Sequence, residues 1–183
     1  MSKQLDSIDS ELAAWIARQR VFFVATAPLS AEGHINVSPK GGDAFRVLGP
    51  MEVAYQDYTG SGAESAAHVI ENGRIVVMFC AFDGSPKIVR LHGRGTLVTP
   101  DKPRYAELAA LFPAHAGTRA FMHVSVTRVS SSCGYSVPFL EFRGHRDTLD
   151  RWTEGKGPEE LERYRAAKNQ RSIDGLPAFS PRS

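Results

Sequence analysis

The sequence of 183 residues lacks most features that mark secreted, membrane-spanning or metal-binding proteins. It has only two cysteines, Cys80 and Cys133, which cannot form a disulfide framework and give no pair at metal-ligand spacing. Its longest uninterrupted apolar run, Ile75 to Phe82, is far shorter than the roughly 20 residues that cross a bilayer. The N-terminal segment is acidic and has no apolar signal-peptide core. These absences lead us to expect a reducing, cytoplasmic compartment.

An excess of one charge and the common catalytic motifs are also missing. Lys and Arg number 22 against 20 Asp and Glu, a formal net charge of +2, so bulk charge indicates neither nucleic-acid nor membrane binding. No Gly-x-Gly-x-x-Gly, Walker or Gly-x-Ser-x-Gly pattern occurs, and the six histidines form no His-Glu-x-x-His pair. We therefore expect no metal site. With 42% hydrophobic and 23% charged residues, the chain has the composition of one ordinary globular domain.

Hydrophobic periodicity predicts many short strands and few helices. Strands are predicted over residues 21–27, 34–38, 44–48, 51–55, 74–82, 87–98 and 120–129. Helices are predicted over residues 5–19, 64–72, 101–112 and 158–170. Loops are predicted at 39–42, where Pro39 is followed by paired glycines, and at the polar segment 56–62. The tight hairpin over 74–98 favours antiparallel pairing, and hence a small barrel with peripheral helices.

Three of these segments carry polar groups that suit an anionic, partly aromatic ligand. Ser38 and Lys40 lie at a predicted strand terminus. Residues 57–61 place two aliphatic hydroxyls and backbone amides before a helix, where phosphate is favoured. In residues 87–90, alternation puts Ile88 and Arg90 on one strand face. Taken singly, each segment could equally be a turn, a surface loop or a solvated barrel exterior.

In their order along the chain, these segments resemble the pyridoxamine 5′-phosphate oxidase-like family of FMN-binding split barrels. The resemblance runs from Val21 to Thr99, with a looser extension through Ser132 to Pro138, and residues 172–177 are similar to the ending of uncharacterised members. It implies a mainly β (α+β) fold, an antiparallel split β-barrel of six to seven strands. Residues 1–140 would form the FMN-binding domain with its N-terminal helix, and residues 141–183 a helical extension and tail of the same domain.

The resemblance also implies a homodimer with two FMN sites at the subunit interface. The cofactor-binding residues it implies are Val37, Ser38, Pro39, Lys40, Tyr58, Thr59, Gly60, Ser61, Lys87, Ile88, Arg90, Cys133 and Gly134. The first four would lie beside the flavin ring and ribityl chain, the next four against ring and phosphate, and the two basic residues of 87–90 on the phosphate. The turn at Cys133 would come from the partner chain. Gly62 and Ala63 stand where many relatives carry Arg-Lys, so phosphate would depend on other cations, with Arg74 a candidate substitute.

The function implied is that of an FMN-dependent oxidoreductase acting on an unidentified small molecule. No catalytic side chain is singled out, because the cofactor itself carries the electron chemistry. Two alternatives stay open: a non-catalytic flavin-binding or flavin-sequestering protein, and a split barrel that uses haem or a deazaflavin. Authentic pyridoxamine 5′-phosphate oxidase activity is not expected, because no Arg-x-His pattern follows Trp152. Neither nucleic acid nor membrane is an expected partner.

Overall fold

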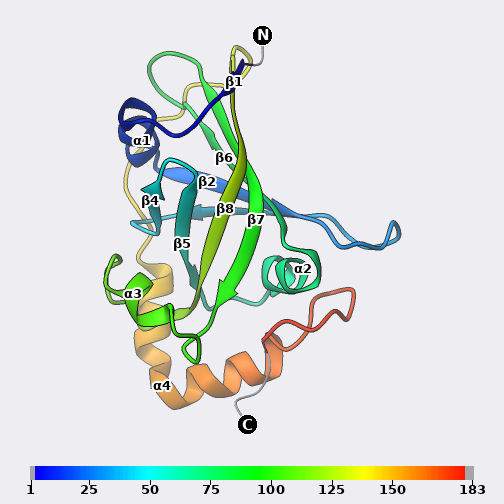
Figure 1. The fold of residues 1–183 in the computed structure, drawn as a ribbon. Coiled ribbons are helices and arrows are strands. Elements are labelled where there is room, and N and C mark those ends of the chain that lie inside the picture. Colours follow the sequence, from blue (N-terminus) through cyan, green and yellow to red (C-terminus); the bar gives the residue numbers. More distant parts are fainter. Residues whose placement is uncertain (1–2, 180–183) are drawn as a thin grey trace.

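A single curled antiparallel sheet dominates the computed structural model, which describes residues 3–179 (Figure 1). Its strands are β1 (Lys3–Leu5), β2 (Val21–Thr26), β3 (Asn36–Gly41), β4 (Phe45–Gly49), β5 (Glu52–Tyr58), β6 (Arg74–Cys80), β7 (Ile88–Val98) and β8 (Thr118–Ser132). Seven of them follow the order β3-β2-β6-β7-β8-β5-β4, and the short β1 pairs with β8. The expected fold, an antiparallel split barrel with peripheral helices, is confirmed.

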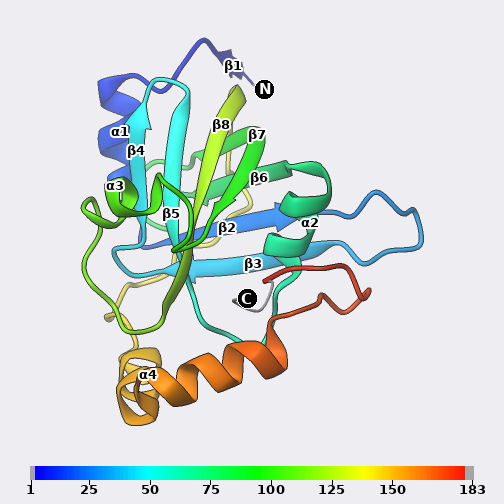
Figure 2. The ribbon, with the colours of Figure 1, turned by 60° about the horizontal axis from the view of Figure 1, so that its bottom comes forward.

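In the described part of the chain, four helices lie around this sheet. They are α1 (Ser10–Ala17), α2 (Glu64–Asn72), α3 (Tyr105–Ala109) and α4 (Thr148–Lys168). Figure 2 shows α4 lying along one end of the sheet, with the following segment running back toward β3 and α2. Within the described residues, no helix combines the length and apolar composition needed to cross a bilayer.

The core fills the concave face of the sheet with aromatic rings from strands far apart in the sequence. Phe22 of β2 lies 5.1 Å from Phe45 of β4 and 5.7 Å from Tyr55 of β5, between ring centroids. Phe79 of β6 contacts the Phe45 ring edge-on at 5.0 Å. Such tilted and edge-on pairs add stabilisation beyond the area that they bury. The curl therefore brings the two ends of the strand order, β3-β2 and β5-β4, around one aromatic core.

The predicted bounds of helix α2 are confirmed, whereas the predicted start of helix α1 is wrong. Helix α2 spans the predicted residues 64–72 and ends at Gly73, whose φ of +69° is the left-handed conformation that glycine adopts readily. The first helix does not begin at residue 5. It begins after Asp9, whose carboxylate accepts a hydrogen bond from the Leu12 amide at 2.7 Å, because this side chain caps the free amides of the first turn.

Two predicted loops are strand. Strand β3 continues through Pro39 to Gly41. Within residues 3–179 its one partner strand is β2, and a proline is tolerated on such an edge strand. Strand β5 continues through Gln56 and Asp57 to Tyr58, and both of those polar residues are buried. Polar composition misled the prediction there, since buried partners satisfy these side chains.

The helices of the second half also differ from prediction. Helix α3 covers only residues 105–109 of the predicted 101–112, because turns occupy the segment around Pro103. Helix α4 begins at residue 148 rather than 158. Gly157 interrupts it with φ +68° before Pro158, so the predicted helix is the second arm of a kinked pair.

Candidate functional site

The convex side of the sheet carries a strip of half-exposed apolar side chains. Register places Pro39 opposite Phe23, Phe23 opposite Met78, and Met78 opposite Arg90, so these side chains share one face. We call this surface the outer face; its residues are Phe23, Ala25, Val37, Pro39, Val76, Met78, Arg90 and His92. It offers an aromatic ligand a flat apolar wall.

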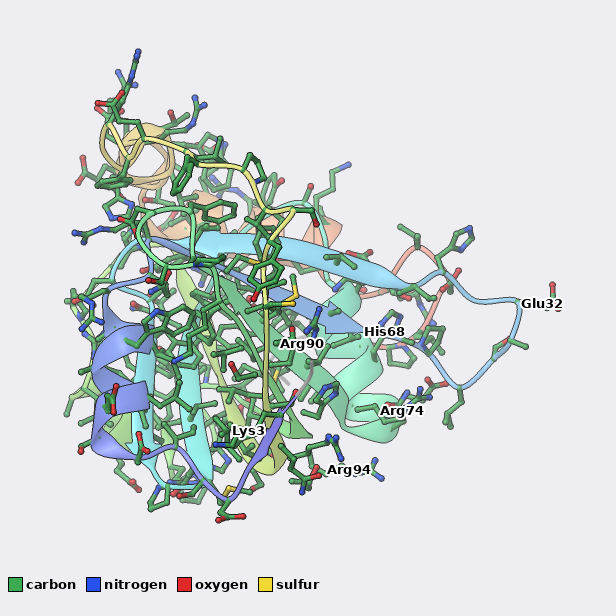
Figure 3. All side chains as sticks on the ribbon, turned by 90° about the horizontal axis from the view of Figure 1, so that it is seen from above. Lys3, Glu32, His68, Arg74, Arg90 and Arg94 are labelled. Carbon is green, nitrogen blue, oxygen red and sulfur yellow. The ribbon has the colours of Figure 1, made fainter. Side chains whose placement is uncertain are left out.

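Positive charge surrounds this apolar strip. Arg74 lies directly opposite Arg94 across β6 and β7, and His92 lies directly opposite Arg128 across β7 and β8. Burial lowers the pKa of His92, and the neighbouring charges of Arg128 and Arg90 lower it further. Within residues 3–179, Arg74, Arg90, Arg94 and Arg128 form no ion pair. Figure 3 labels three of these arginines on β6 and β7.

Like charges directly opposite each other destabilise a sheet, so an anion bound here would relieve repulsion. Arg90 is the most favourably placed of these cations. It is half-buried beside Met78, and its guanidinium Nη1 donates a hydrogen bond to Ser132 Oγ at 3.1 Å. The expected pairing of Ile88 and Arg90 on one strand face agrees with the alternating burial of β7.

The pleat of β3 separates the four residues expected beside the flavin. Val37 and Pro39 point outward, whereas Ser38 and Lys40 point into the concave side. Ser38 donates a hydrogen bond to Asn36 Oδ1 at 3.0 Å, and Lys40 Nζ donates to Asp57 Oδ1 at 3.1 Å. Only half of this segment can therefore contribute side chains to the outer face.

Lys40 belongs instead to a buried ion cluster that sequence reasoning missed. Asp57, whose side chain is 3% exposed, accepts from Lys40 and from Arg119 Nε, the latter at 2.8 Å. Burial acts to raise the pKa of Asp57, but the charges and hydrogen bonds of Lys40 and Arg119 outweigh it and the pKa is lowered. We call these three residues the seam cluster, because they link β3, β5 and β8 across the concave side of the sheet.

The predicted loop segment 58–61 is held by its neighbours rather than left open. The Thr59 amide and hydroxyl both donate to the Gly117 carbonyl, and the Gly60 carbonyl accepts from Asn169 Nδ2 at 2.8 Å. The Tyr58 ring contacts the His115 ring in a tilted arrangement, with the ring centroids 4.4 Å apart. Ser61 is exposed, but Glu64 follows in the first turn of α2 and its charge opposes phosphate binding there.

The remaining predicted residues gather where β7 begins and β8 ends. Gly134 packs so closely on Ile88 that an added Cβ would lie 3.3 Å from Ile88 Cγ1. Lys87 and Cys133 line an open cavity of about 770 Å³, in which the Lys87 ammonium lies 4.8 Å from the Trp15 ring. Cys133 is exposed, and Arg74 lies at the opposite end of β6. The structure thus brings together five of the predicted residues: Lys87, Ile88, Arg90, Cys133 and Gly134. Lys40 and Thr59 lie elsewhere, on the concave side and beside Gly117.

The residues of the outer face fit a flavin mononucleotide in chemical type. The apolar strip suits an isoalloxazine ring. The arginines, which form no ion pair among residues 3–179, suit one phosphate dianion, because Arg binds phosphate through charge-assisted hydrogen bonds. The strip is open to solvent at its β3 end, since its Val37 is 62% exposed. Among residues 3–179, no group of three or more His, Cys, Asp or Glu could hold a metal ion.

Comparison with known sequences identifies a family and a relative that this chain resembles. Residues 8–133 match the family described as pyridoxamine 5′-phosphate oxidase. The chain is 40% identical over 191 residues to the pyridoxamine 5′-phosphate oxidase family protein ustO of Aspergillus flavus, covering 95% of this chain and 76% of that protein.

Solved structures share the fold at lower identity. HupZ of Group A Streptococcus superposes with a TM-score of 0.51 at 20% identity, over 67% of this chain and 91% of HupZ. A Lactobacillus delbrueckii protein, provisionally assigned as a pyridoxamine 5′-phosphate oxidase, superposes with a TM-score of 0.53 at 17% identity, over 69% of this chain and 98% of that protein. A FAD-binding protein from Mesorhizobium loti gives 0.50 at 14% identity, over 72% and 96%. At these identities the likeness establishes the split-barrel fold.

Proposed function

Because the chain belongs to the pyridoxamine 5′-phosphate oxidase family, we propose that it binds FMN on its outer face and acts as an oxidoreductase on a small molecule. The observation that carries the proposal is the arrangement of this face, an apolar strip bordered by arginines that form no ion pair with any carboxylate of residues 3–179. When bound, the flavin supplies the electron chemistry. The chain's residues bind and orient it: the apolar strip contacts the ring, and Arg90 holds the phosphate.

The substrate of this proposal is not pyridoxamine 5′-phosphate. Trp152, the tryptophan of the C-terminal region, packs edge-on against Tyr164 at 5.0 Å inside the kinked helix α4. It lies next to Lys156, whose ammonium is 5.3 Å from the Trp152 ring. Trp152 therefore packs the first arm of α4 against the second arm, which carries Tyr164. A cytoplasmic location, favoured by two free cysteines, is part of the same proposal.

Titration with FMN, FAD and riboflavin tests the proposal directly. FMN is expected to bind at least about tenfold more tightly than riboflavin, because a charge-assisted phosphate contact contributes about 1.5–3 kcal/mol. FMN is also expected to bind more tightly than FAD, since the face offers cations for one terminal phosphate. Fluorescence quenching of each flavin measures the affinities. Absence of affinity for any flavin would overturn the proposal, and absence of turnover with NADH or NADPH would leave a carrier rather than an enzyme.

We propose that a second copy of the chain covers the outer face. The segment 133–147, which we call the strap, connects β8 to α4 without regular structure, and the Leu140 amide donates to the Phe82 carbonyl just after β6. Its Tyr135 and Phe139 are 84% and 80% exposed, and Leu140 and Phe142 are also exposed. Contiguous exposed apolar side chains of this size are typical of protein interfaces.

The full chain is therefore expected to be a dimer in solution at micromolar concentration. Burying the strap and the outer face removes apolar surface from water in both copies, which favours association. Light scattering coupled to gel filtration should give about twice the chain mass of 20.0 kDa. The double variant Phe139→Ser/Leu140→Ser should shift the mass toward the monomer, whereas Leu29→Ser, at an exposed leucine of the β2–β3 connection, should not. A folded, flavin-loaded monomer would contradict the proposed dimer.

A further inference from the structure

A second cavity, of about 760 Å³, opens at the end of the sheet away from Arg90. Its lining residues come from the end of β7, the start of β8 and the second arm of α4. Figure 1 shows these elements at the same end of the sheet. Its apolar walls include Leu97, Ala166, Ala178 and Phe179, and its cations include Arg119 and Arg165. Arg90 and Leu97 are separated along β7 by roughly 20 Å at about 3.3 Å per residue, so this cavity is distinct from the outer face.

Arg119 reaches this cavity because β8 contains a bulge. Asp57 pairs with Ala120 and Tyr58 pairs with Thr118, so Arg119 is the extra residue that opposes nothing on β5. A bulge re-aims the side chain that it carries, and bulges are common beside binding sites. The Arg119 guanidinium lies 4.8 Å from the Phe179 ring centroid, which forms part of the cavity wall.

One nitrogen of this guanidinium has no partner. The Arg119 side chain is only 9% exposed and its Nε donates to Asp57, but Nη1 is buried without a hydrogen-bond acceptor among the described residues. A buried donor that is left unsatisfied destabilises the folded chain, and a charged donor does so more strongly. Such a group in a cavity wall indicates that an acceptor from outside the chain completes the site.

The charge balance of the seam cluster points in the same direction. Asp57 is one carboxylate shared by two cations, Lys40 and Arg119, so the cluster holds one uncompensated positive charge. Among the described residues that line the cavity, the formal charges of Lys102 and Arg165 equal those of Asp101 and Glu162, so these four add no net charge. A ligand with a single negative charge would neutralise the seam cluster. A phosphate dianion would leave an excess of negative charge close to the carboxylates of Asp101 and Glu162.

We propose that this cavity binds a small organic monoanion, with its carboxylate on Arg119 Nη1 and its apolar body against Leu97, Ala166 and Phe179. The site is independent of the flavin face and goes beyond the proposed flavin chemistry. It gives the chain a carboxylate-recognition site in which one arginine serves both the seam cluster and the ligand. The bulge supplies the geometry, because a regular strand would not present Arg119 in this position.

Titration of the full-length chain with 3-phenylpropanoate tests the site, with the neutral 3-phenylpropanamide as the matched probe. Calorimetry and backbone amide NMR should show saturable binding of the carboxylate, with shifts around Leu97 and Ala178. The amide should bind at least about tenfold more weakly, because it does not place a negative charge on Arg119. Equal binding of the two probes, or displacement of the carboxylate by equimolar inorganic phosphate, would overturn the assignment.

Two variants separate this site from general effects on folding. Arg119→Lys retains a cation for Asp57 but lacks Nη1, and should weaken 3-phenylpropanoate binding at least about tenfold, whereas Arg163→Lys, at a 73% exposed arginine of α4 outside the cavity, should not. If Arg119→Lys does not fold, Ala166→Trp decides, because it fills the cavity from an exposed helix position. Unchanged probe binding in Ala166→Trp would overturn the site. FMN affinity should be unchanged in Ala166→Trp, so failure of this site and failure of flavin binding give different results.

Discussion

Replacement of Asp57 by alanine is expected to lower the free energy of unfolding by about 3–5 kcal/mol. The carboxylate is 3% exposed and is the anion shared by Lys40 and Arg119, which are themselves only 19% and 9% exposed. Its removal leaves two cations close together away from water, without the hydrogen bonds that Asp57 accepts. Loss of one partner from a buried ion pair costs far more than the pair contributes relative to an apolar replacement.

Urea denaturation followed by circular dichroism measures this change. The matched control is Asp43→Ala, which removes a 68% exposed carboxylate paired with Arg46 and should cost no more than about 1 kcal/mol. A loss at Asp57 as small as at Asp43 would show that the seam cluster does not support the fold.

The same carboxylate gives an expected dependence on pH. Because its pKa is lowered in the folded chain, ionised Asp57 contributes stability above the unfolded pKa of about 4, and this contribution is lost as pH falls through the folded pKa. Asp57→Asn should lack this acid-side loss, so the wild-type and variant stabilities should converge as the pH falls.

The second large effect is expected in flavin binding. Arg90→Ala should weaken FMN affinity about ten- to hundredfold, because it removes a charge-assisted contact worth about 1.5–3 kcal/mol from a half-buried position. Fluorescence titration measures the affinity, and Arg151→Ala, at a 70% exposed arginine of α4, is the control. Riboflavin affinity should fall much less than FMN affinity, because the contact is to phosphate.

The family resemblance implies that Lys40 lies near the flavin, whereas the structure pairs it with Asp57. The variant Lys40→Ala distinguishes a role in flavin binding from a role in stability. Because its ammonium is bound to Asp57, its substitution is expected to lower stability first, and any loss of FMN affinity should be smaller than in Arg90→Ala. Unchanged FMN affinity in Arg90→Ala would show that the phosphate does not lie on the outer face.

Local signals in the sequence predicted much of the fold. Gly73 marked the end of α2 because the left-handed conformation that ends the helix depends on the glycine itself and not on distant residues. The apolar runs of β6 and β7 marked the hairpin that these two strands form. The errors occurred where distant partners decide the structure. Pro39 is compatible with β3 only because that strand lies at an edge, and Gln56 is buried only because Pro113 and Thr118 satisfy its amide.

The candidate site was less accessible to sequence reasoning for the same reason. Alternation could have grouped Arg90, His92 and Arg94 on one strand face, since they lie two residues apart. Arg119 carried no such signal, because its position depends on a bulge between two strands some 60 residues apart in the chain. The inward direction of Lys40 likewise follows from the register of β3 on β2.

Pro39 also limits how two copies of this protein can meet. The free edge of β3 would otherwise present a row of backbone donors and acceptors to another strand, but the proline has no amide hydrogen to offer. Growth of the sheet across subunits, the route by which edge strands aggregate, is therefore blocked midway along β3. The dimer proposed above would instead pack face against face, an arrangement that closes after two copies and makes no use of this edge.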